Sequence, residues 1–156
     1  MESRDFGSVT TIVTTDFEAL YAYKRGDYRQ CLQLSTQNVH ALLCAMHVTT
    51  IPTFPEFIQL LDDDMAALTA LTLIVKPDCR VVDGRYVRIT QLTLSLYLMT
   101  RCQLKLRHSM TSLAQTLRYI KVARRRHLPD RTLDQLTLKL IGRRVVSYMR
   151  TLHDWT

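Results

Sequence analysis

The fold of this chain is decided by residues 23–32, which read YKRGDYRQCL. Gly26 can adopt the positive φ that ends a helix, and Asp27 can cap the helix that follows. The small residues Ala19 and Cys31, one on each side of the turn, would let the two helices approach closely. The stretch therefore predicts a tight turn between two antiparallel helices.

Composition predicts one domain of long helices. The chain has 156 residues, of which 47% are hydrophobic, enough for a single buried core. Only 4 Gly and 4 Pro interrupt the chain, so long helices are expected.

The cysteines and the apolar runs indicate where the protein is located. The 4 cysteines form no Cys-x-x-Cys pair and no apolar signal segment follows Met1, so we expect free thiols and a cytoplasmic or nuclear location. The apolar runs 65–75 and 89–100 are shorter than the roughly 20 residues of a membrane span, so no membrane association is expected.

The pattern along the chain predicts an all-α fold. Residues 1–13 show no helical period and are predicted as an extended leader, followed by a single all-helical domain over residues 14–156. Helices are predicted over residues 14–26, 27 to about 47, 53 to about 75, 88–106, 109–127, and from 130 or 132 to 152. These six helices are expected to pack as antiparallel pairs, in an array or a bundle.

Two segments carry mixed signals. Leu92, Leu94, Leu96 and Leu98 alternate with other residues, which taken alone favours a strand. The run 88–106 has no Gly or Pro and is longer than a typical strand, so we predict a helix. The Asp-Gly pair within residues 81–87 is typical of a hairpin turn, and a short hairpin or an exposed loop fits there equally.

Residues 19–32 resemble the tetratricopeptide repeat. Ala19, Gly26, Tyr28 and Cys31 occupy the places of its small residue, turn glycine, aromatic residue and second small residue, and the match covers about half of one repeat. The resemblance implies stacked helix pairs with a concave groove that holds a peptide or a partner helix. It implies a non-enzymatic adaptor or regulatory module that binds another protein and needs no cofactor.

Charge is distributed unevenly along the chain. Residues 1–75 carry a net charge of −5 and residues 76–156 carry +12. The basic residues that could bind a partner are Arg118, Lys121, Arg124, Arg125, Arg126, Arg143 and Arg144, and Arg150 could extend the strip of the last helix. Such strips can neutralise an acidic or phosphorylated protein segment or the phosphates of a nucleic acid. The alternative is that they only solvate the outer faces of the last helices.

One cluster has the spacing of a metal site. His40, Cys44 and His47 follow one another at i, i+4 and i+7, so they could share one helix face, and imidazole with thiolate is typical of zinc sites. No nearby residue supplies a fourth ligand with a familiar spacing, so we predict a buried thiol between hydrogen-bonded histidines and no metal. The consecutive residues 62–64, all Asp, fan around a helix and cannot act as an acid–base pair.

Overall fold

The computed structural model describes residues 9–44, 67, 68, 70, 89–126 and 132–154. They form five helices: α1 (Val9–Arg25), α2 (Tyr28–Cys44), α5 (Gln91–Lys105), α6 (Met110–Arg126) and α7 (Thr132–Asp154). Across these ranges no residue lies in a strand, and Thr90 makes an isolated β-bridge. The prediction of an all-α fold is confirmed at this level.

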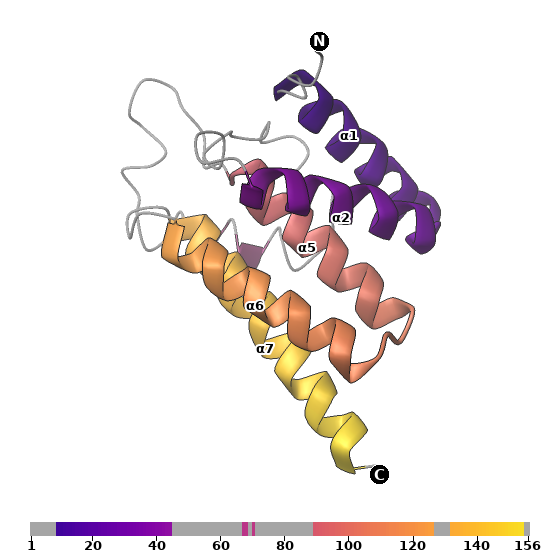
Figure 1. Cartoon of the computed structure of the whole chain (residues 1–156), viewed down its shortest axis with the longest axis vertical. Helices are drawn as coiled ribbons and strands as arrows, with labels where there is room; N and C mark the ends of the chain where they lie inside the picture. Colours follow the sequence, from indigo (N-terminus) through magenta and orange to yellow (C-terminus); the bar gives the residue numbers. More distant parts are fainter. Residues whose placement is uncertain (1–8, 45–66, 69, 71–88, 127–131, 155–156) are drawn as a thin grey trace.

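Helix α5 lies at the centre of the described fold. It packs against α1 and α2 on one side and against α6 and α7 on the other (Figure 1). Every residue from Gln91 to Thr100 is buried. Alternating leucines in a helix point to opposite sides, and here both sides are covered, which explains why the segment has the pattern of a strand. The prediction of a helix over this segment is confirmed.

The predicted turn at Gly26 is present. Gly26 has a φ of +82°, in the left-handed region that glycine adopts without steric cost. The Asp27 N–H donates to the Ala22 carbonyl at 2.9 Å and the Gly26 N–H to the Tyr23 carbonyl at 3.1 Å, which is the Schellman pattern at a helix end. Asp27 Oδ1 then accepts from the Gln30 N–H at 3.2 Å and caps α2.

Small residues near the turn are fully buried. They are Ala19 in α1 and Cys31 and Ser35 in α2, and the Cys31 thiol contacts Cys102 of α5. Tyr28, the aromatic residue of the turn, meets Tyr23 edge to face with ring centroids 5.7 Å apart. Gly26 and Tyr28 therefore contribute directly to this helix junction, and Ala19 and Cys31 are buried on either side of it.

A buried carboxylate joins the beginnings of α5 and α7. Asp134 Oδ1 accepts from the Thr90 N–H at 2.9 Å, from the Thr90 hydroxyl at 3.1 Å and from the Thr93 hydroxyl at 2.6 Å. Thr90 is also the N-cap of α5. A negative charge near two helix N-termini is favoured by both helix dipoles. This contact fixes α7, and with it one wall of the groove described below, against the central helix.

The first helix begins earlier than the sequence predicts. Residues 9–13, assigned to the extended leader, belong to α1. All five are β-branched, which costs roughly 0.7 kcal/mol or less per residue in a helix, and each residue added to an existing helix gains a hydrogen bond. The prediction of a leader is therefore wrong for these five residues.

Other predictions fall outside the described residues. The helix predicted over residues 53 to about 75 is described only at Ala67, Leu68 and Ala70, which are helical. The hairpin or loop near residues 81–87 lies wholly outside. Within the described ranges, none of the helices combines the length and apolar character that crossing a membrane requires.

Candidate functional site

The candidate site is a groove between α6 and α7. Ser109 begins α6, because its Oγ accepts from the Ser112 N–H at 3.3 Å, and α6 ends in three arginines. Where α6 packs against α7, an open groove of about 500 Å³ follows the line of contact. Its apolar floor is formed by Leu117, Ile120, Leu138, Gly142 and Val146. The groove is thus a surface feature with an apolar centre.

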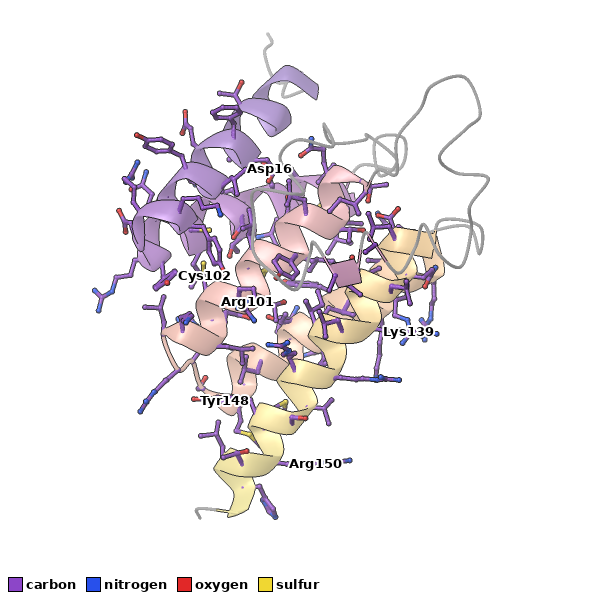
Figure 2. All side chains as sticks on the ribbon, turned by 180° about the vertical axis from the view of Figure 1, so that it is seen from behind. Asp16, Arg101, Cys102, Lys139, Tyr148 and Arg150 are labelled. Carbon is purple, nitrogen blue, oxygen red and sulfur yellow. The ribbon has the colours of Figure 1, made fainter. Side chains whose placement is uncertain are left out.

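Long cationic side chains border this floor. They are Lys121 and Arg124 from α6 and Lys139, Arg143 and Arg150 from α7. In Figure 2, Lys139 and Arg150 extend along the same edge of α7. No acidic side chain is among the described residues that line the groove. The groove therefore presents positive charge on both sides of an apolar strip.

The cations of the groove are not neutralised by described neighbours. An ion pair away from the groove joins Arg25 and Asp27, 3.9 Å apart and exposed, in the turn between α1 and α2. Lys121, Arg124 and Arg143 make no ion pair within the described ranges. Their charge is therefore free to attract an anionic ligand.

Gly142 shapes the floor. A Cβ atom at this position would lie 3.9 Å from Ile120 Cγ2, an ordinary van der Waals contact. Glycine is therefore not needed there for packing or for backbone conformation, and it costs helix stability relative to alanine. Because glycine has no side chain, the groove is deeper at this position, between the cations of α6 and those of α7.

Three of the basic residues chosen from the sequence line this groove: Lys121, Arg124 and Arg143. Arg125 lines an adjoining recess together with Lys121, Arg124 and Gln135. Gln135 of α7 donates from Nε2 to the Arg124 carbonyl at 3.3 Å, which ties the two helices together at this end.

The remaining three basic residues lie elsewhere. Arg126 donates from Nη1 to the Leu42 carbonyl at 3.2 Å and from Nη2 to the Leu43 carbonyl at 2.7 Å. It thereby satisfies carbonyls at the end of α2, which is a structural role. Arg118 is exposed and lines neither recess, and Arg144 has an interaction of its own. The sequence prediction therefore mixed groove residues with residues that hold the fold.

One groove cation, Lys139, was missed from the sequence. Lys139 and Arg150 stand at i−4 and i+7 relative to Arg143, so all three share one side of α7. That spacing was present in the sequence and could have identified Lys139. What the spacing could not show is that α6 contributes an opposing row.

The predicted histidine and cysteine cluster has a structural contact. The His40 Nε2 atom lies 3.0 Å from the Tyr119 hydroxyl, and the rings meet edge to face at 5.6 Å. Cys44, the last residue of α2, is exposed, not buried as predicted. His47 lies outside the described residues. Among those described, no group of three His, Cys, Asp or Glu side chains is placed to hold a metal ion.

Two other titratable groups are buried away from the groove. Asp16 of α1 lies against α5 (Figure 2), and its Oδ1 accepts from the Ser95 hydroxyl at 2.7 Å. Burial raises the pKa of Asp16 to about 7, although hydrogen bonds from Ser95 and Asn38 act in the opposite direction. A hydrogen bond with Cys102 and burial raise the pKa of the Cys31 thiol, which makes it a poor nucleophile.

Comparison of the chain with family models, with curated proteins and with solved structures finds no match.

Proposed function

We propose that this protein is a non-enzymatic interaction module, an adaptor or regulator of the cytoplasm or nucleus, that binds a peptide or partner helix. The observation that carries the proposal is the groove between α6 and α7, with an apolar floor and Val146 37% exposed in it. Exposed apolar surface bordered by polar groups is typical of sites that bind other proteins.

The groove is built directly on the packed core. Leu138 of the floor is completely buried and Ile120 is 3% exposed, so the floor is continuous with the core. Asp134 and Gln135 attach the beginning of α7 to α5 and α6. A preformed groove loses little conformational freedom on binding, which favours affinity.

The tetratricopeptide-like arrangement is part of this proposal. Its support is the junction of α1 and α2 at Gly26, with Ala19 and Cys31 fully buried on either side. In this arrangement α1 with α2 and α6 with α7 would be antiparallel pairs stacked on α5, and the helix predicted from the sequence over residues 53 to about 75 would complete the set of six.

A second candidate function is the binding of nucleic acid or another polyanion. The recess formed by Lys121, Arg124, Arg125 and Gln135 favours it, because three cations meet there with an amide that can also bind a phosphate oxygen. The two candidates differ in how far salt weakens binding: phosphate neutralisation weakens steeply as counterions are added, whereas groove binding keeps the contribution of its apolar floor.

A comparative pull-down tests the proposal. Bait protein is incubated with nuclease-treated extract at low salt and at about 1 M salt, where the Debye length falls to about 3 Å. Protein partners that survive both treatments and are lost on Val146→Asp, which puts a carboxylate in the apolar floor, support groove binding. Thr111→Asp, an exposed change in the first turn of α6, is the matched control. Recovery that disappears with nuclease and is unaffected by Val146→Asp would contradict the proposal in favour of the polyanion candidate.

A further inference from the structure

We infer that the groove between α6 and α7 binds an acidic amphipathic helix about three turns long, an inference that rests on the proposed function and specifies its ligand. The charges, the dimensions and the apolar floor of the groove each support it.

The charges call for a ligand with carboxylates on two sides. Lys121 and Arg124 border the groove along α6, while Lys139, Arg143 and Arg150 border it along α7. A helix that lays an apolar stripe on the floor carries its polar residues on both flanks of that stripe. Glu or Asp on those flanks would meet both rows of cations. A basic or neutral helix would leave the cations facing like charge or no partner.

The length of the groove along α7 matches a short helix. Along α7 the lining residues extend from Leu138 to Arg150. At 1.5 Å rise per residue this interval is about 18 Å long, which equals about 12 residues of a helix lying along it. Lys139 and Arg143 stand one turn apart, so carboxylates at i and i+4 of the ligand would align with them.

The floor distinguishes a helix from a nucleic acid. Val146 and Leu117 offer apolar contact, and Gly142 lets a ligand backbone or side chain approach α7 closely. A helix in a groove buries its apolar stripe against such a floor. A phosphate backbone needs cations but no apolar strip, and it would be served as well by the exposed Arg118 outside the groove.

Three synthetic peptides of about 14 residues test the inference by fluorescence anisotropy. The first has leucines at i, i+3, i+4 and i+7 with glutamates on both flanks. The second has the same composition in scrambled order, and the third replaces each glutamate by glutamine. We expect the first to bind about tenfold or more tighter than the other two, because only it supplies both the apolar stripe and the charge.

Reversing the charge of two groove residues tests whether the peptide binds in the groove. The double substitution K139E and R143E is expected to weaken binding of the first peptide by about tenfold or more. A fourth peptide, with lysine for the glutamates on one flank, should bind this variant better than it binds the unchanged protein. Arg118→Glu, which reverses an exposed cation of α6 outside the groove, is the matched control and should change binding by about twofold or less.

Any other result of the peptide-binding experiments would overturn one specific part of the inference. Equal affinity for the glutamine peptide would overturn the acidic ligand and leave groove binding in place. Equal affinity for the scrambled peptide, or for single-stranded DNA, would overturn the helix and favour the polyanion candidate. If no peptide binds to protein whose helical circular dichroism is intact, the inference fails, and the Val146→Asp pull-down separately decides the proposed function.

Discussion

The two helix pairs that flank α5 differ in the side chains near their own contacts. In α1 and α2 several side chains close to the turn are small, and Ala19, Ala22 and Cys31 are completely buried. Between α6 and α7 they include Lys121 and Arg143, which border an open groove. Small side chains let two helices close on each other, whereas long cations keep their charged ends in water and leave space between them. Both pairs contribute to the core, but the second pair also leaves a groove open to solvent along its line of contact.

The comparison also explains where ionisable groups are perturbed. Asp16 is 2% exposed, where α1 meets α2 and α5, and its Oδ2 atom has no hydrogen-bond partner in the described part of the chain. At the open pair, the cations point into solvent and keep their hydration. Burial between closely packed helices therefore disfavours the charged form of Asp16, whereas the exposed cations of the groove keep their hydration and pay no such desolvation energy.

The largest expected effect concerns Asp16. Its pKa rises from 3.8 to about 7 on folding, which corresponds to about 4 kcal/mol at most. Because the folded state holds this proton more tightly than the unfolded chain, the stabilisation is full below about pH 4 and is lost as pH rises through about 7. We expect Asp16→Asn to remove this loss, so its free energy of unfolding in urea, relative to that of the unchanged protein, should rise between these pH values.

Glu18→Gln is the matched control for this prediction. Glu18 is on the same helix but exposed, so its substitution removes a carboxylate without touching the closed junction. Its unfolding free energy, relative to the unchanged protein, should stay constant over the same pH range. If Asp16→Asn and Glu18→Gln gave the same pH profile, Asp16 would not be enclosed as the structure has it.

The next largest effect is a change in stability when a small residue of each helix pair is replaced by a larger one. Ala19→Leu should destabilise the protein by about 1–3 kcal/mol, because a completely buried site has no room for the longer side chain. Gly142→Ala should stabilise it by about 0.5–1 kcal/mol, because the new Cβ has its nearest contact at 3.9 Å and alanine favours a helix. Urea midpoints measure both, and equal signs would abolish the distinction between a closed and an open pair.

Local signals made much of the helix pattern predictable from the sequence. Gly26 and Asp27 specify a turn through their own backbone and capping preferences, and Ser109 specifies the beginning of α6 in the same way. The absence of Gly and Pro identified α5 despite its alternating leucines. The start of α1 was missed because β-branched residues carry a weak helical signal that the rest of the helix overrides.

Tertiary contacts made the site less predictable. Arg126 was chosen as a ligand-binding residue from its neighbours in sequence, but its hydrogen bonds reach carbonyls 83 and 84 positions away. The groove depends on how α6 lies against α7, which no local pattern encodes. The burial of Asp16 likewise depends on Ser95, 79 positions away, so a carboxylate typical of a helix start became a core residue.

The smallest expected effect concerns two turns between helices, the turn at Gly26 between α1 and α2 and the turn at Arg107 between α5 and α6. The turn after α5 repeats the pattern at Gly26, since the His108 N–H donates to the Gln103 carbonyl at 3.1 Å and the Arg107 N–H to the Leu104 carbonyl at 3.3 Å. Here, however, the residue at positive φ is Arg107, at 55°, where a side chain is disfavoured by about 1 kcal/mol.

Exchanging residue types at the two turns should therefore have opposite results. Arg107→Gly is expected to stabilise the protein by about 0.5 kcal/mol, since relief of the backbone is offset by the greater freedom of glycine in the unfolded chain. Gly26→Ala should destabilise it by about 1 kcal/mol. At Gly26 a Cβ would meet nothing within 4 Å, so that cost comes from the backbone and not from a clash. Thermal unfolding measures both changes, and a loss of stability in Arg107→Gly would mean that the Arg107 side chain, not its backbone, determines this turn.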